Sequence, residues 1–112
     1  MPKRVLILSD TFGGGDAQLG GVLMRNFIYS LARSEPRPVA VMLANEGVRL
    51  VCEGSEVIDD FKLMVEAGVT VKACGTCLDF LKLADAQLVG DVGTMVQAVE
   101  AMMADAQVVT IA

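Results

Sequence analysis

The sequence predicts a three-layer α/β/α domain built on a five-stranded, mostly parallel sheet. Short apolar or β-branched runs of strand length alternate with segments whose apolar residues recur at helical spacing. Because right-handed crossovers place a helix over each pair of parallel strands, this alternation covers both faces of the sheet. At 112 residues the chain fits a single domain, residues 1–112.

The first strand and helix are expected in the first third of the chain. Residues 5–8 form a continuous apolar run, which is typical of a strand buried on both faces. Asp16 is the candidate N-cap of a helix in which apolar residues recur every three or four positions between residues 19 and 31. Pro36 closes this helical segment.

The middle of the chain contains two further strands, residues 39–43 and 69–73, with a helix between them. Ser55 is the candidate cap of that helix, and Gly68 supplies its carboxyl-terminal stop. After the third strand, Thr76 is followed three residues later by an acid, which is a capping pattern. Thr76 is therefore expected to be the N-cap of the third helix.

The last quarter of the chain completes the alternation. Residues 87–90 are the weakest strand candidate. Thr94 and Gln97 form a capping-box pattern at the start of an amphipathic segment that extends to Met103. Residues 108–111 are the final strand.

Composition excludes several classes of function. The net charge is −5 and the nine basic residues are scattered, so no nucleic-acid partner is expected. No apolar stretch approaches the ~20 residues of a membrane helix, and the run after Lys3 and Arg4 is too short for a signal peptide, so we expect a soluble, cytoplasmic protein with no membrane partner. The hydrophobic content of 54% is high for so short a chain and favours a homo-oligomer, although a sheet covered on both faces is itself apolar.

The absence of histidine limits the available chemistry further. It removes Ser-His and Cys-His nucleophile pairs and zinc sites of the Cys/His type. Three cysteines cannot supply a four-thiolate zinc site within one chain. We therefore expect no metal and no other cofactor.

Residues 74–77, Cys-Gly-Thr-Cys, are the strongest candidate site. They lie between the third strand and the third helix, where the unpaired N–H groups of a helix start would lower a thiol pKa. The alternative is that two small residues pack in a buried loop. Cys52 belongs to no recognisable motif and is interpreted as a small packed hydrophobe.

Two other loops follow strands and so belong to the edge of the sheet where such folds bind ligands. Gly13, Gly14 and Gly15 are expected to border the Cys74 crevice rather than to bind a nucleotide, because the loop lacks the G-x-G-x-x-G spacing and carries acids. Asn45 either holds a ligand or forms a turn.

Several segments together resemble the DsrE/DsrF-like family, most closely the carboxyl-terminal domain of YedF-type proteins, which are linked to sulfur and selenium metabolism. The segments are residues 12–16 (FGGGD), 19–20 (LG), 23–24 (LM), 45–50 (NEGVRL), 53–56 (EGSE) and 74–79 (CGTCLD). The resemblance implies strand order 4-3-2-1-5 and assembly as trimers or hexamers. It also implies that Cys74 accepts sulfane sulfur from a donor protein, holds it as a persulfide and passes it to an acceptor protein. TusA-like proteins are among the partners that the resemblance suggests.

The function expected is that of a sulfurtransferase-like sulfur or selenium carrier. Cys74 would be the nucleophile and Cys77 a resolving or auxiliary thiol. Substrate-binding groups would come from Gly13, Gly14 and Gly15, from Asn45, and from Gly75 and Thr76 at the start of the helix. The alternatives are a non-catalytic oligomeric binding subunit and a dithiol-disulfide redox switch.

Overall fold

The computed structural model describes residues 2–112 and contains one five-stranded sheet in the order β4-β3-β2-β1-β5. All four neighbouring strand pairs are parallel. The strands are β1 (Lys3–Ile7), β2 (Ala40–Leu43), β3 (Thr70–Cys74), β4 (Asp91–Gly93) and β5 (Gln107–Ile111). The helices are α1 (Ala17–Ala32), the 3-10 helix η1 (Asn45–Val51), α2 (Ile58–Glu66), α3 (Gly75–Phe80) and α4 (Met95–Met103). The predicted fold class and strand order are confirmed.

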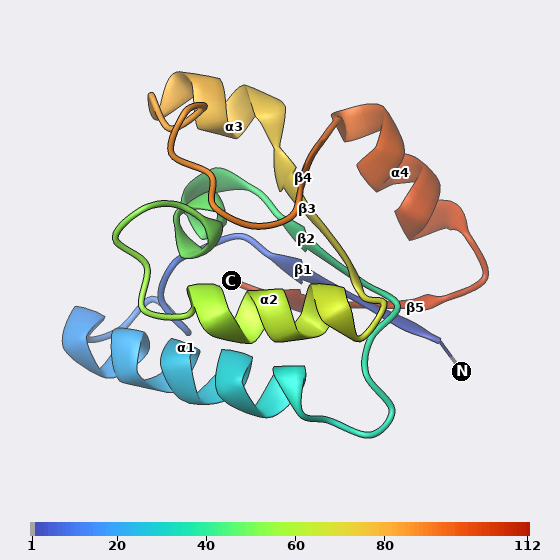
Figure 1. Ribbon diagram of the computed structural model, residues 1–112, viewed down its shortest axis with the longest axis horizontal. Coiled ribbons are helices and arrows are strands. Elements are labelled where there is room, and N and C mark those ends of the chain that lie inside the picture. Colours follow the sequence, from blue (N-terminus) through green and yellow to red (C-terminus); the bar gives the residue numbers. More distant parts are fainter. Residues whose placement is uncertain (1) are drawn as a thin grey trace.

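The hydrophobic core lies between one face of the sheet and the helices α1 and α2. Figure 1 shows these two helices side by side on one side of the sheet, with α4 on the other side. Alternate strand residues and one stripe of each helix are buried there because successive side chains of a strand point to opposite faces. The central members of this core are Val5, Ile7, Val41, Leu43, Val71 and Ala73 from the strands, and Met24, Ile28, Phe61 and Met64 from the helices.

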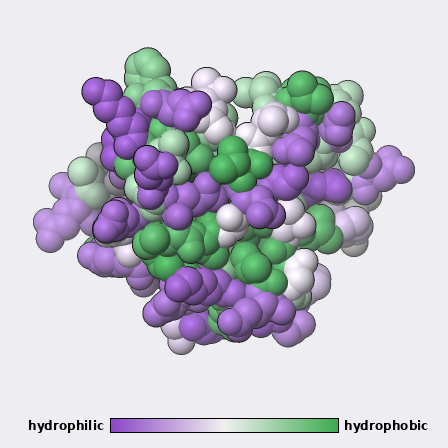
Figure 2. Space-filling model, turned by 45° about the horizontal axis from the view of Figure 1, so that its top comes forward, coloured by the Kyte–Doolittle hydropathy of each residue, from purple (hydrophilic) through white to green (hydrophobic). Residues whose placement is uncertain are grey.

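The second face of the sheet is covered thinly. β4 and β5 are the two edge strands, so the chain between them crosses the whole sheet, and α4 is its only helix. None of the residues of α4 is buried. Only Ala98 and Ala101 of this helix are partly shielded. Figure 2 shows hydrophobic patches that remain on the surface of the molecule.

Three of the predicted helix signals are confirmed. Asp16 caps α1, with its side chain accepting a hydrogen bond from the N–H of Leu19 at 2.9 Å. Thr94 and Gln97 form the reciprocal capping box of α4. Gly68 follows the end of α2 with φ of +93°, a conformation that favours glycine.

Ser55 does not cap α2, and that prediction is wrong. The helix begins at Ile58, and its cap position is Val57, which makes no side-chain cap bond. The Ser55 hydroxyl instead donates to the carbonyl of Leu50 and accepts the N–H of Val57. It therefore fastens the loop between η1 and α2.

The strand predicted at residues 87–90 lies instead at Asp91–Gly93, where it forms β4. Gln87 forms an isolated antiparallel bridge with Cys52, and its side-chain amide donates to the carbonyls of Val89 and Asp91. The apolar residues at 88 and 89 therefore belong to a loop that runs beside residues 51–53, and the strand starts only after Gly90.

Candidate functional site

The two cysteines of the predicted site lie at the carboxyl end of β3. Cys74 is the last residue of this strand, in register with Gly93 of β4, and Cys77 lies on α3. Both side chains are partly exposed, whereas Cys52 is 1% exposed. The interpretation of Cys52 as a packed residue is confirmed.

Thr76 is not the cap of α3, contrary to prediction. The helix begins at Gly75, directly after the strand, and Cys74 itself occupies the cap position. Thr76 and Cys77 are thus the second and third helical residues, and no side chain caps the helix. The physical reason is that no loop separates β3 from α3. Gly75 permits this close turn, because a Cβ there would lie 3.0 Å from Cγ1 of Val92 on β4.

Cys77 lies close enough to the Cys74 thiol for Cys74 to affect its ionisation. Burial raises the pKa of the Cys77 thiol, and the neighbouring Cys74 thiol raises it further. The backbone N–H of Asn45, which donates to the Cys77 sulfur at 3.1 Å, acts in the opposite direction but does not outweigh these effects. Cys77 is therefore held as a neutral thiol beside Cys74.

Asn45 joins the site through its backbone. Its φ is +52°, a conformation that asparagine tolerates better than most residues. The side-chain oxygen accepts the N–H of Glu46 at 2.9 Å, so the side chain stabilises the turn itself. The two interpretations of Asn45 from the sequence, turn and ligand contact, are thus linked, since the turn points its own N–H at the Cys77 sulfur.

A cavity of about 50 Å³ adjoins Cys74 on the second face of the sheet. Its lining is mostly apolar and comes from β1, β2, β3 and the start of α4: Leu6, Met42, Leu43, Ala44, Lys72, Gly93, Thr94, Met95 and Ala98. The first turn of α4 therefore lies next to Cys74, in addition to that of α3. The apolar wall suits a polarisable sulfur atom, and the helix start beside it favours negative charge there.

The glycine loop lies elsewhere. The N–H of Gly13 donates to the carbonyl of Ala112, after the end of β5, and side chains added at Gly13, Gly14 or Gly15 would meet open space. β5 and β3 are on opposite sides of β1 in the sheet. None of the three glycines lines the cavity beside Cys74. Their part in substrate binding stays a prediction.

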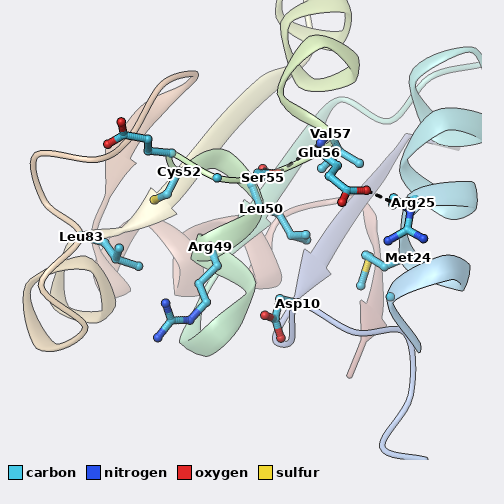
Figure 3. A pocket seen from close by; sticks show the side chains of 13 residues that line it. Asp10, Met24, Arg25, Arg49, Leu50, Cys52, Ser55, Glu56, Val57 and Leu83 are labelled. Carbon is cyan, nitrogen blue, oxygen red and sulfur yellow. Dashed lines mark hydrogen bonds and ion pairs between the residues drawn. The ribbon is translucent and has the colours of Figure 1, made fainter. Parts of the chain in front are cut away.

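A larger hollow of about 310 Å³ lies between α1, η1 and the loop before α2 (Figure 3). Arg25 pairs with Glu56 at 3.3 Å across its rim, and Arg49 pairs with Glu46. Acids balance the two arginines, so the hollow has no excess of positive charge. Sequence reasoning missed it, because its arginines are far apart in the chain and no motif links them.

Cys52 contributes to the wall of this hollow but is an unreactive thiol. Its sulfur donates to the carbonyl of Val48 at 3.2 Å. Burial raises the pKa of Cys52 above the ordinary value of 9.0. Its role is packing, as the sequence suggested.

Within residues 2–112, no cluster of three histidine, cysteine or acidic side chains could hold a metal ion. No helix of the described chain is long and apolar enough to cross a membrane.

Comparisons with known proteins identify relatives of this fold. The model of the DsrE/DsrF-like family matches residues 21–111. The YchN protein of E. coli has 20% sequence identity over 99% of this chain and 100% of its own, with a TM-score of 0.70. MTH1491 of Methanobacterium thermoautotrophicum, a protein of unknown function, has 19% identity over 98% and 99%, with a TM-score of 0.68. BT1422 of Bacteroides thetaiotaomicron has 15% identity over 97% and 94%, with a TM-score of 0.67. No curated protein sequence matches the chain.

Proposed function

The chain belongs to the DsrE/DsrF-like family, which is associated with sulfur metabolism, and from this premise we propose that Cys74 carries sulfane sulfur as a persulfide. The observation that supports the proposal most is the position of Cys74. It ends β3 beside an apolar cavity and two helix starts, next to a second thiol, Cys77, whose pKa is raised.

Loading requires only a thiolate and a donor. The Cys74 thiolate attacks the terminal sulfur of a donor persulfide, a new S–S bond forms on Cys74, and the donor leaves as a thiolate. The proton of the donor persulfide passes to solvent or to the leaving thiolate. No oxidant is consumed, because the sulfane sulfur moves between two thiols.

The assignment of Cys74 rather than Cys77 as the nucleophile follows from their interaction. The pKa of Cys77 is raised, so this thiol is mostly protonated near neutral pH. Because the thiolate is the nucleophilic form, the protonated Cys77 is the poorer nucleophile of the two, and the carrier role falls to Cys74.

Release has two routes. An acceptor thiolate attacks the terminal sulfur and regenerates Cys74. Alternatively, Cys77, once deprotonated, attacks the Cys74 sulfur, which releases hydrosulfide and leaves a Cys74–Cys77 disulfide that an external dithiol must reduce. We assign the donor and acceptor roles to proteins of the sulfur relay, TusA-like ones included, as in YedF-type systems. Selenium would follow the same steps.

The test is mass spectrometry of the intact protein after incubation with a persulfide donor. The wild type should gain one sulfur atom, Cys74→Ser should gain none, and Cys77→Ser should load but release more slowly. Cys52→Ser is the matched control and should load like the wild type. Equal loading of the wild type and Cys74→Ser would overturn the proposal.

The same experiment separates the alternatives. A redox switch would yield only a two-hydrogen mass loss from disulfide formation and no sulfur adduct. A non-catalytic binding subunit would show neither change.

A further inference from the structure

Arg4 on β1 is a cation without a counterion. The chain has five arginines, and the other four, at positions 25, 33, 37 and 49, each form an ion pair. Among residues 2–112, Arg4 forms none. Its Nη1 atom is buried and has no hydrogen-bond partner in the described chain. A buried charged donor without an acceptor is costly. An anionic acceptor bound beside Nη1 would therefore stabilise this site.

Arg4 lines a cavity of about 350 Å³ between the second face of the sheet and α4. The other polar residues of its wall are Thr70, Lys72 and Gln97. The remainder is apolar, namely Val39, Ala40, Val41, Met42 and Ala101. The cavity therefore contains two cationic side chains and hydrogen-bond donors, and no carboxylate belongs to its wall.

Lys72 is also unpaired within the part of the chain that the structure describes, since its ammonium is in none of the four ion pairs found there. Its neighbour in register on β4 is Asp91, an exposed carboxylate that forms no ion pair with it. The wall of this cavity thus carries two cations and no acid, although the chain as a whole has a net charge of −5. Two like charges in one cavity repel each other unless an anion lies between them.

We infer that this cavity binds an oxyanion between Arg4 and Lys72. The guanidinium offers two parallel N–H donors to adjacent oxygens, Lys72 supplies a second charge, and Gln97 and Thr70 are polar groups within the same wall. The cavity shares Met42 and Lys72 with the one beside Cys74. Lys72 precedes Cys74 by two residues on β3, about 6.6 Å along the strand.

An oxyanion group can reach this position in two forms. One is a free inorganic ion. The other is the anionic end of a small thiol whose sulfur lies at Cys74. This second form rests on the proposed function, whereas the anion site itself does not.

The first experiment measures binding without any sulfur chemistry. Inorganic phosphate is titrated into protein in an oxyanion-free buffer, and amide shifts are followed by NMR. Saturable shifts are expected around Arg4, Lys72 and Gln97. Arg4→Gln and Lys72→Gln should each weaken binding about tenfold or more. Lys62→Gln, at an exposed and unpaired lysine on α2, is the control and should bind like the wild type.

The absence of saturable shifts would overturn the inference, as would equal weakening by Lys62→Gln. Loss of oligomers in Arg4→Gln with unchanged phosphate binding would also overturn it, because Arg4 would then serve a subunit contact. If Arg4→Gln does not fold, Lys72→Gln and Arg4→Lys decide the question. Arg4→Lys keeps a charge but loses the paired donors, so weaker binding than in the wild type supports the site.

The second experiment distinguishes the source of the anion. Protein loaded at Cys74 is treated with 2-mercaptoethanesulfonate or with neutral 2-mercaptoethanol, and the rate of sulfur removal is compared. A preference for the anionic thiol that Lys72→Gln abolishes assigns the site to a small thiol. Phosphate binding without such a preference assigns it to an inorganic oxyanion. Failure to load Cys74 would contradict only the proposed function, since the phosphate titration stands alone.

Discussion

The three cysteines differ in what surrounds each sulfur. Cys52 donates to a backbone carbonyl in the core, Cys77 lies beside Cys74 and accepts the N–H of Asn45, and Cys74 faces an apolar cavity. These contacts distinguish one buried thiol from two partly exposed ones. They also make the reactivity of Cys77 depend on its neighbour.

We predict that replacement of Cys74 makes Cys77 more reactive. In Cys74→Ala the Cys77 thiol loses the neighbouring Cys74 thiol that raises its pKa, so this pKa should fall toward the ordinary value of 9.0, although burial still raises it. At pH 7 to 8 a lower pKa means more thiolate and faster alkylation by iodoacetamide. Peptide mass spectrometry should show faster labelling of Cys77 than in the wild type and unchanged protection of Cys52. A slower reaction of Cys77 would contradict the geometry.

Gly47 on η1 illustrates a residue whose size is limited by the backbone. It is buried, and a Cβ at this position would collide with the carbonyl of Ile7, which accepts the N–H of Ala44 at 3.0 Å. We predict that Gly47→Ala lowers the free energy of unfolding by about 1–3 kcal/mol. Urea denaturation measures this change. Gly14→Ala is the matched control, because its Cβ would meet open space, and an equal loss there would refute the argument.

At the scale of elements, the two threonines with capping patterns give a direct comparison. Thr94 accepts the N–H of Gln97 at 3.1 Å, whereas Thr76 makes no cap bond. We predict that Thr94→Ala costs about 1 kcal/mol and increases hydrogen exchange throughout α4. The same substitution at Thr76 should change stability by less than about 0.5 kcal/mol. A larger loss of stability in Thr76→Ala than in Thr94→Ala would contradict the structure and support Thr76 as the N-cap of α3.

The strands and most helix ends were predictable because their signals are local. Apolar β-branched runs marked four strands, and Asp16 and Thr94 marked helix starts that the structure contains. The prediction that Thr76 caps α3 was wrong because a capping pattern depends on a loop before the helix, and here β3 runs directly into α3. The prediction of a strand at residues 87–90 was wrong because this segment lies beside residues 51–53, a contact distant in sequence.

The candidate site was predictable only in part, for a similar reason. The cysteine motif is local and identified Cys74 and Cys77. The contact of Asn45 with Cys77 spans 32 residues, and the cavity under α4 joins Arg4 to Lys72 across three strands. No periodicity or spacing links such residues, since their proximity arises from the strand order.

At the scale of the whole molecule, the surface is larger and more apolar than a lone domain requires. The accessible area is 6447 Å², whereas a monomer of 11.8 kDa has about 5,900 Å² by the usual scaling with mass. Several of the exposed large hydrophobic side chains lie on α4, where Met95, Val96 and Met103 are 65%, 67% and 80% exposed. An amphipathic helix with so much uncovered apolar surface is typical of a protein interface.

We therefore predict a homo-oligomer, trimeric or hexameric, in which α4 contacts a second copy of the chain. Light scattering coupled to gel filtration should give a mass that is a multiple of 11.8 kDa. Val96→Glu should shift this mass toward that of the monomer, because a buried unpaired carboxylate at a subunit contact opposes assembly. Val65→Glu on α2, at a residue that is 43% exposed on the opposite side of the sheet, is the control and should leave the mass unchanged. A wild-type monomer at every concentration would contradict assembly itself. Dissociation by Val65→Glu alone would place the subunit contact on the face that α1 and α2 cover. The exposed methionines and valines of α4 would then have a role other than contact between copies.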